Sequence, residues 1–429
     1  EQCSRALEIY LDLYDDDDAR TRLCRLTLGR ALTWLGLKDQ AEDQLTRALA
    51  SARRQLGQEH PDTIFAMLEL AQHYMDMHAR AGEAETLCRE VLESPGAATR
   101  AGTWTELHAR AQLAFALSVQ FQNHEAMRLA LQTREDLRAR KAEGSGLYLF
   151  VHFVLGLCAT NLGDFVGAEA YYRAGSALAV ELAGDESFIA ATSHQNIAHT
   201  LISQHRWAEA EPEARTAYET HLRNMGERHP YTRSTRVMLI ASQFAQRADD
   251  AVLQRQAQAI IEASVESHSA EPLRTTNALA GFFLESGDLD QAGNVLAWGL
   301  TLKQQTLEYP RPEPYEHMML QARLDTARGR FEQAAELFRS TLAQAAARLP
   351  EWTCHPASML DYGTCELRLG NHAASEELLL ECYDRFTDLK MPRDAAITAT
   401  RLVELYEAMQ RPEDADIWRA RLGNTTSTP

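Results

Sequence analysis

The chain has 429 residues, of which 45% are hydrophobic, and its 61 acidic against 43 basic side chains give a net charge of −18. Single hydrophobic cores rarely grow to this length without splitting or repeating, so we expect several domains or one long array. The excess of negative charge would repel a phosphate backbone, so nucleic acid is not an expected partner.

The spacing of the cysteines and the length of the apolar runs indicate where in the cell the protein is expected. Seven cysteines are scattered along the chain without a C-x-x-C pair, which favours buried thiols in a reducing cytoplasm. The longest apolar run, residues 147–159, contains His152 and is shorter than the roughly 20 residues that cross a bilayer, so it predicts a helix buried on two sides. We therefore expect a cytoplasmic protein with no membrane partner. Because the chain begins at Glu1 without an initiator Met or a signal-peptide pattern, we also expect a possible N-terminal effector domain in a longer protein.

An internal repeat runs along the chain. A small residue followed by alanine twelve positions later occurs at Gly29 and Ala41, and similar pairs recur with first members at positions 29, 71, 114, 156, 198, 241, 280, 322, 363 and 403. The period is about 42 residues, so the octets LGQEHPDT and MGERHPYT, 169 residues apart, occupy the same loop four periods apart. In that loop the Gly can end one helix in a left-handed conformation, and the Pro suits the first turn of the next.

Each repeat predicts a helical hairpin. In the first repeat the polar turn LKDQ separates LTLGRALTWLG from AEDQLTRALASARRQL. The second of these segments places Ala41, Leu45, Ala48 and Leu49 on one apolar stripe with a 3.6-residue period. Small side chains at Gly29 and Ala41 let the two helices approach closely, so we assign these positions to packing.

The repeats resemble the tetratricopeptide repeat (TPR). Segments that match the family's pattern are LAQHY at 70–74, LGLCA at 155–159, GDFVGAEAYYRAG at 163–175 and GRFEQAAELFRSTL at 329–342. The usual repeat has about 34 residues, whereas a period near 42 with EHPDT and RHPYT loops is similar to the kinesin-light-chain-like variety, found behind kinase or nucleotide-switch modules in bacterial signalling proteins. The resemblance implies an all-α fold, a right-handed superhelical solenoid of about ten TPR-like helical hairpins.

The repeat pattern divides the chain into five predicted sections. Residues 1–18 hold the second helix of a truncated upstream repeat plus an acidic loop, and residues 19–235 hold repeats one to five. Residues 236–270 hold a degenerate sixth repeat, which lacks the Gly turn and the alanine, and which is either a hinge or a diverged repeat that packs normally. Residues 271–422 hold repeats seven to ten, and residues 423–429 form a polar tail. Within the eighth repeat, YPRPEPYEH at 309–317 predicts a proline-stiffened loop.

Signatures of catalysis are missing from the sequence. The four aspartates from Asp15 to Asp18 raise the alternative of a metal site, but they precede an expected helix N-terminus, where carboxylates are favoured as capping charges. The chain has no Gly-rich phosphate loop, no nucleophile elbow, no kinase signature and no cysteine pair of zinc spacing. We therefore expect no cofactor, no metal ligand and no catalytic residue.

The expected binding surface is the concave face, which the first helices of the hairpins line near their small residues. On this basis the groove is formed by Gln72, Gln112, Phe115, Asn161, Gln195, Asn196, His199, Ser203, Ser242, Gln246 and Asn277, with Arg30 and Arg323 toward its ends. Amides both donate and accept hydrogen bonds, so they can satisfy the backbone of an extended peptide whatever its side chains. The resemblance adds that Asn196 matches the asparagine with which kinesin-light-chain-like repeats bind peptide backbone.

These features predict a non-enzymatic scaffold for protein–protein interaction. We expect a protein or peptide ligand in the concave groove, and a role as the regulatory or targeting region of a larger signalling protein. Two alternatives remain from the sequence. One is a sensor of small molecules or peptides with the sixth repeat as its hinge, and the other is an α/α metal-dependent enzyme around Asp15 to Asp18.

Overall fold

A computed structural model describes residues 2–35, 37–76, 80–96, 100, 102–247, 252, 255–256, 259, 271–306, 312–349, 356–388 and 391–425. Across these ranges the chain forms 20 α-helices and no strand, which confirms the predicted all-α fold. The helices belong to two compact units, Glu1–Asn161 and Leu162–Pro429, called the first and the second unit below and described separately. The five sections that we infer from the repeat pattern remain a prediction.

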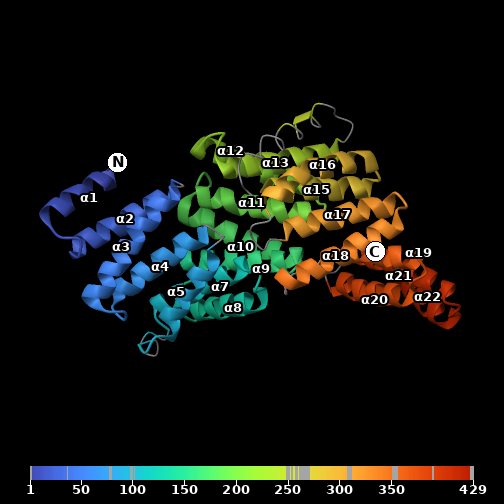
Figure 1. Ribbon diagram of the computed structural model, residues 1–429, viewed down its shortest axis with the longest axis horizontal. Helices are drawn as coiled ribbons and strands as arrows, with labels where there is room; N and C mark the ends of the chain where they lie inside the picture. Colours follow the sequence, from blue (N-terminus) through green and yellow to red (C-terminus); the bar gives the residue numbers. More distant parts are fainter. Residues whose placement is uncertain are drawn as a thin grey trace. The chain divides into compact units, whose positions relative to one another are not determined.

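The first unit runs from α1 to α9 (Figure 1). Its helices are α1 (Gln2–Leu13), α2 (Ala19–Trp34), α3 (Lys38–Leu56), α4 (Pro61–Asp76), α5 (Ala81–Glu93), α7 (Trp104–Val119), α8 (Asn123–Ala139) and α9 (Gly146–Asn161). Helices α2 and α3, α4 and α5, and α7 and α8 pack as hairpins, and α9 packs on both α7 and α8. The first helices of the repeats are α2, α4, α7 and α9.

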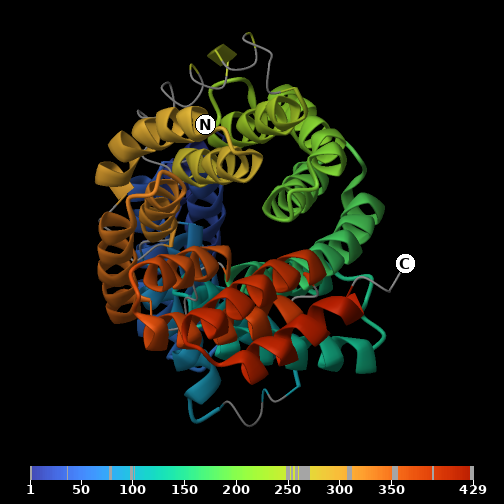
Figure 2. The ribbon, with the colours of Figure 1, turned by 90° about the vertical axis from the view of Figure 1, so that its right-hand side faces the viewer.

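The second unit runs from α10 to α22. Its helices are α10 (Phe165–Ala183), α11 (Phe188–Ser203), α12 (Trp207–Met225), α13 (Pro230–Gln246), α15 (Glu271–Ser286), α16 (Leu289–Thr306), α17 (Glu313–Ala327), α18 (Phe331–Arg348), α19 (Pro356–Arg368), α20 (His372–Asp388), α21 (Pro392–Ala408) and α22 (Pro412–Thr425). In Figure 2 these helices, coloured from green to red, follow one another along a curve. The first helices are α11, α13, α15, α17, α19 and α21.

The small residues of the repeat are packing positions, as predicted. The second members of the pairs have no exposed surface in nine repeats: Ala41, Ala84, Ala126, Ala168, Ala210, Ala292, Ala334, Ser375 and Ala415 are all 0% exposed. A Cβ atom on Gly29 would lie 2.6 Å from Cγ of Leu45, on the facing helix α3. Protein interiors are packed too densely to absorb such an overlap without a shift of the helices.

The recurring octet connects one hairpin to the next. Gly57 and Gly226, with φ of 81° and 80°, follow α3 and α12 in the left-handed region that favours glycine. Nδ1 of His60 accepts a hydrogen bond from a backbone N–H two residues later, and Nδ1 of His229 does the same as the N-cap of α13. The proline after each histidine is the first residue of its helix, where its missing N–H costs nothing. The octet therefore recurs because both loops need the same helix end and helix start.

The acidic run caps a helix, which confirms the interpretation as capping charges. Asp18 is the N-cap of α2 and accepts the backbone N–H of Arg20 at 2.8 Å. Asp17 bonds Arg54 at 2.5 Å, and this pair is the main reason that the pKa of Asp17 lies below its usual value. Asp16 pairs with Arg25 of the following helix.

One sequence interpretation is wrong. Residues 313–317 are not part of a loop, because α17 begins at Glu313, with Pro314 in its first turn. Proline is tolerated there for the same reason as in the octet, so the prolines of this segment mark a helix start. Residues 309–311 lie outside the described residues.

Two other features bear on the predictions. The sixth repeat keeps its first helix, α13, but the segment 248–270 lies outside the described residues, apart from residues 252, 255–256 and 259, so the hinge stays a prediction. No helix in the described ranges combines the length and the apolar character that a membrane crossing requires.

Candidate functional site

Positions on the first helices are counted here from the small residue of each repeat, so that position −2 is two residues before it. Residues at −9, −6, −3, −2 and +1 share one face of an α-helix, because each residue advances the helix by about 100°. We call this the inner face of a first helix. The small residue itself points instead toward the second helix of its own hairpin.

In the first unit, the predicted groove residues have different surroundings. Gln72 and Gln112 are half-buried, and Oε1 of Gln112 is buried without a hydrogen-bond partner among the described residues. Phe115 is 9% exposed. Asn161 is part of the fold, since its Nδ2 donates to O of Ser118 and to Oδ1 of Asn123, both at 3.0 Å. At the predicted end of the groove, Arg30 forms an ion pair with a glutamate of α4.

In the second unit, several predicted groove residues join neighbouring first helices. Nε2 of Gln195 on α11 donates to a serine of α13 at 3.4 Å, although Oε1 of Gln195 is buried without a partner in the described part. Asn277 on α15 is buried and donates to a backbone carbonyl of α17 at 2.9 Å. Ser203 and Ser242 donate to carbonyls of their own helices, whereas Gln246 is exposed and donates to Glu211. The contacts of Gln195, Asn277 and Gln246 hold adjacent repeats together.

Asn196 has a different environment from its neighbours on α11. It is half-buried at position −2, and its amide makes no hydrogen bond with another described residue. Gln112 occupies position −2 of α7. The two amides therefore stand at the same repeat position, one in each unit.

An aromatic cluster on the inner face of the first unit was missed by the sequence interpretation, apart from Phe115. The ring centroids of Phe115 and Phe150 lie 5.7 Å apart, and those of Phe115 and Phe153 lie 5.6 Å apart, both with edge-on geometry. Leu23 and Phe65, at position −6 of α2 and α4, are 60% and 43% exposed. The inner face of the first unit therefore carries an apolar cluster beside its polar groups. The available signal was the spacing of Phe150 and Phe153, three residues apart in the apolar run.

The same face of the second unit is charged where α11, α15 and α17 meet. Arg274 at position −6 of α15 lies 2.5 Å from Oε1 of Glu313 at position −9 of α17. Burial and then the charge of Glu313 raise the pKa of Glu316 to about 7, against the opposing effects of Arg274 and a hydrogen bond with Asn277. Burial, together with the charge of Arg274, lowers the pKa of His199 to about 3, so this imidazole is neutral at physiological pH.

A second charged cluster lies farther along this unit. Arg323 at position +1 of α17 bonds Asp361 of α19 at 2.6 Å. His205, between α11 and α12, lies 2.8 Å from Glu285 at the end of α15. The pKa of Asp394 in the first turn of α21 is raised by burial and by the charge of Glu285. Charged side chains from the fifth, seventh and tenth repeats therefore influence one another within this unit.

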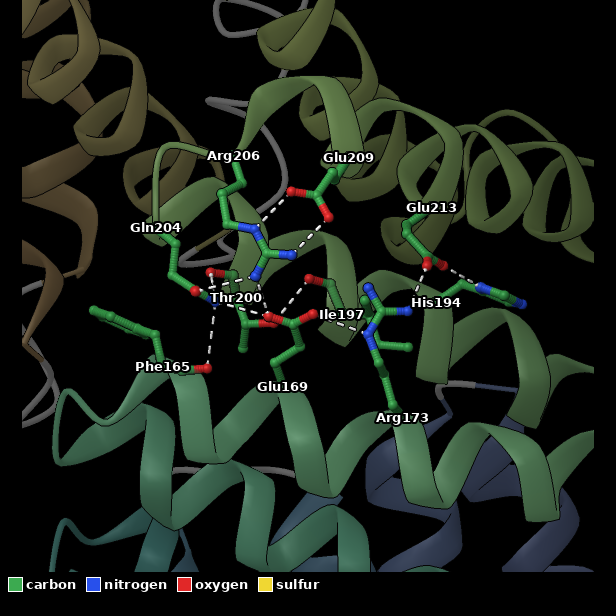
Figure 3. Close-up of polar contacts among 10 residues, drawn as sticks. All are labelled: Phe165, Glu169, Arg173, His194, Ile197, Thr200, Gln204, Arg206, Glu209 and Glu213. Carbon is green, nitrogen blue, oxygen red and sulfur yellow. Dashed lines mark hydrogen bonds and ion pairs between the residues drawn. The ribbon is translucent and has the colours of Figure 1, made fainter. Parts of the chain in front are cut away.

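A further polar network joins consecutive hairpins, as Figure 3 shows for the fourth and fifth repeats. Glu169 of α10 accepts hydrogen bonds from Arg173 at 2.9 Å, from Gln204 at 3.1 Å and from Arg206 at 2.5 Å. The contact between Glu169 and Arg206 recurs in other hairpins, between Glu42 and Arg80 and between Glu376 and Arg411. In each case the glutamate directly follows the small residue of a second helix. We call this glutamate–arginine pair between consecutive repeats the clasp, and we expect it to stabilise the packing of one repeat on the next.

Metal chemistry does not mark a different site in the described part of the chain. No group of three or more His, Cys, Asp or Glu side chains is arranged there to hold a metal ion. A half-open cavity of about 250 Å³ lies in the first unit, between the loop after α3 and the end of α5. Its carboxylates Glu59 and Glu90 are paired with Arg100 and Arg53, so it offers little free chemistry.

Comparisons with known proteins place this architecture in a family. A family model described as tetratricopeptide repeat matches residues 21–62 and 191–231, each about one full period of this array. The repeats of the chain are therefore of the tetratricopeptide type. No curated protein matches the sequence significantly.

Solved structures are similar to the chain at low sequence identity. A Rap protein complexed with a competence and sporulation factor is 12% identical, with a TM-score of 0.54 over 95% of this chain and 98% of that one. A putative kinesin light chain of Podosopora anserina with nearly identical TPR-like repeats is 20% identical, with a TM-score of 0.37 over 46% and 93% of the two chains. Yeast Tom70 is 12% identical, with a TM-score of 0.43 over 93% and 89%. At these identities, the likeness to the Rap protein indicates a shared fold alone.

Proposed function

We propose that this chain is a non-enzymatic scaffold that binds an extended segment of a partner protein on the inner faces of its first helices. One observation carries the proposal. Gln112 and Asn196 present half-buried amide groups at the same repeat position, and the described residues leave Oε1 of Gln112 and the Asn196 amide without hydrogen-bond partners. The buried Oε1 of Gln112 costs about 1–3 kcal/mol without a partner, which a ligand N–H would recover, and the Asn196 amide is left available to a ligand backbone.

An extended peptide backbone is the ligand that best fits such positions. It presents N–H and C=O groups alternately at regular spacing, and an amide side chain can donate to one and accept from another. The similar Rap structure holds a competence and sporulation factor, which is the kind of binding role that we propose for this chain. The eleven residues assigned to the groove remain the candidates for this contact, with Asn196 and Gln112 as the main ones.

The arrangement of the acidic run favours a scaffold over the metal-dependent enzyme. Asp16, Asp17 and Asp18 are engaged by Arg25, Arg54 and a helix N-terminus. A divalent cation would have to displace these contacts before it could bind. We further propose a cytoplasmic role as the regulatory or targeting region of a larger signalling protein. Finding a kinase or nucleotide-switch module ahead of Glu1 in the full gene product would support that role.

Selection of ligands from a random heptapeptide library displayed on phage tests the proposal. The purified chain should enrich a family of peptides, because the inner faces offer hydrogen bonds to any backbone. Asn196→Ala should weaken a synthetic version of an enriched peptide roughly tenfold, since a lost hydrogen bond that leaves a partner unpaired costs about 1–3 kcal/mol. Isothermal titration calorimetry measures this change.

A matched control keeps folding and binding apart. Gln344 is exposed on the second helix α18, away from the inner faces, so Gln344→Ala should leave both affinity and melting temperature unchanged. Asn196→Ala should also melt as the wild type does, because water replaces the ligand around a half-buried amide. Equal peptide affinity in Asn196→Ala and Gln344→Ala would refute a role for α11 in binding. A small molecule that binds while no peptide is enriched would favour the sensor instead.

A further inference from the structure

The charged cluster between α11, α15 and α17 is the part of the inner face whose chemistry is most specific. It consists of His199 on α11, Arg274 and Asn277 on α15, and Glu313 and Glu316 on α17. Helices α15 and α17 pack against each other, and the charge of Arg274 acts on His199 of α11. The cluster therefore belongs to three different repeats.

The cluster contains more carboxylates than cations. Arg274 is its single cation, because His199 is neutral, and it pairs with one oxygen of Glu313. The other carboxylate, Glu316, is half-buried at position −6; Asn277 hydrogen-bonds it and the charge of Arg274 acts on it, but the cluster holds no second cation for it. When Glu316 is ionised, the cluster therefore carries one more negative than positive charge.

The cluster also lacks a hydrogen-bond donor. Glu313 has a side chain that is 3% exposed, and its Oε2 is buried without a partner among the described residues. The nearest amide is already in use, because Asn277 donates from Nδ2 to the backbone carbonyl of Glu313 at 2.9 Å and also hydrogen-bonds the side chain of Glu316, while Oε2 of Glu313 stays unpaired. His317 is engaged as well, through its Nδ1 with Oδ1 of Asn277 at 3.0 Å. Buried carboxylate oxygens are normally paired, so an unpaired one indicates a missing cationic donor.

We propose that this cluster binds a basic side chain, Arg or Lys, of the peptide segment, an inference that rests on the proposed function and specifies its partner. A guanidinium or ammonium group entering beside Glu316 compensates the excess charge and provides the absent donor. Charge-assisted hydrogen bonds are the strongest that a side chain offers, and they gain further strength where water is scarce. Arg fits better than Lys, because its planar fork can engage two carboxylate oxygens at once. An acidic segment would be repelled at this point.

The same library selection provides the test, run on four forms of the full chain. These are wild type, Glu316→Gln, Glu313→Gln and Glu332→Gln. Glu332 is an exposed residue of α18, and Glu332→Gln is the control because it changes the net charge by the same amount as the other two variants. Wild type and Glu332→Gln should enrich Arg or Lys at one peptide position. Glu316→Gln should lose at least tenfold of that enrichment while it still selects peptides. Because Glu313 is buried, the result for Glu313→Gln counts only if its circular dichroism and melting temperature match those of the wild type. If they do not match, the result for Glu316→Gln alone tests the inference.

A synthetic peptide with citrulline in place of arginine separates charge from shape. The citrulline peptide should bind at least tenfold more weakly than the arginine peptide to wild type, but equally well to Glu316→Gln. Affinity for the arginine peptide should increase from about pH 6 to about pH 8, as Glu316 loses its proton, and Glu316→Gln should abolish that increase. Peptides enriched without a basic preference would overturn this inference and leave the proposed function standing. If no peptides are enriched at all, both fail.

Discussion

The aromatic cluster of the first unit and the charged cluster of the second use the same helix positions for opposite chemistry. Position −6 is Phe150 in the aromatic cluster but Arg274 and Glu316 in the charged one, and position +1 is Phe115 in the aromatic cluster but His199 in the charged one. The small residues at the packing positions barely differ between the units. Inner-face positions are free to differ because the hairpin packs without them, whereas the packing positions are limited by the volume between two helices.

The two chemistries stabilise the fold differently. Edge-on contacts such as that of Phe115 with Phe150 add about 0.5–1.5 kcal/mol to the free energy of unfolding beyond the area they bury. Buried charges contribute little net stability, because the cost of desolvation offsets most of their attraction. The aromatic cluster of the first unit should therefore be insensitive to pH and salt, and the charged cluster of the second unit should respond to both.

The largest expected effect is the loss of the aromatic cluster. Phe115→Ala should lower the free energy of unfolding by about 3 kcal/mol, since it removes a buried ring and leaves a cavity. Hydrogen exchange measured by mass spectrometry should show reduced protection of the backbone amides in α7 and α9. The reduction in stability should be the same at about pH 6 and at about pH 8, because the cluster has no titratable group. Phe65→Ala, which removes a ring that is 43% exposed, should cost less than about 1 kcal/mol. Comparable losses in the two variants would contradict the assignment of Phe115 to a buried cluster.

Breaking the charged cluster should have the next largest effect. Arg274→Met should cost about 2 kcal/mol, because Glu313 is left buried without its cation. The double variant Arg274→Met with Glu313→Met should recover most of that loss, since two apolar side chains need no partner. Urea denaturation of the single and double variants gives the coupling between the sites. A double variant less stable than Arg274→Met would show that the pair itself, not the unpaired charge, determines stability.

Acid should destabilise the second unit through its buried histidines. The pKa of His199 is about 3 and that of His221 about 4, both lowered mainly by burial from the ordinary value of 6.5. The unfolded chain therefore binds more protons than the folded one, so stability is full above the ordinary pKa and is lost as pH falls from there toward the folded values. His221→Phe should reduce the dependence of melting temperature on pH in this window. An unchanged slope would mean that His221 is already protonated in the folded chain.

The smallest expected effect is at the clasp that the two units share. Glu42→Gln in the first unit should lower the free energy of unfolding by about 0.5 kcal/mol, because its partner Arg80 is partly exposed. The difference from wild type should shrink at high salt, which screens exposed pairs. Glu169→Gln in the second unit is the matched variant, and we expect its loss to exceed that of Glu42→Gln, because Glu169 is less exposed and has three donors. A loss that salt does not reduce would argue against an electrostatic clasp.

Most of the hairpin could be predicted from the sequence because it depends on local spacing. The pair of Gly29 and Ala41, the stripe that includes Leu45, and the histidine N-cap of the octet all act within one hairpin or one loop. The mistaken loop at residues 309–317 shows the limit of such reasoning, because prolines start a helix as readily as they stiffen a loop. That error concealed Glu313 and Glu316 on a first helix.

The sequence by itself determined the repeat, its period, the helical hairpins and the residues that must be small. These follow from how 3.6-residue periodicity places apolar and small side chains on one side of a helix. Only the tertiary structure decided which inner-face side chains already form hydrogen bonds within the fold, as Asn277 and Asn161 do. It also decided which atoms have no hydrogen-bond partner among the described residues, as for Oε1 of Gln112. It also brought Arg274 to Glu313, and His205 to Glu285, across repeats. Such contacts depend on the angle between successive hairpins, which many small packing contacts set together and no local pattern encodes.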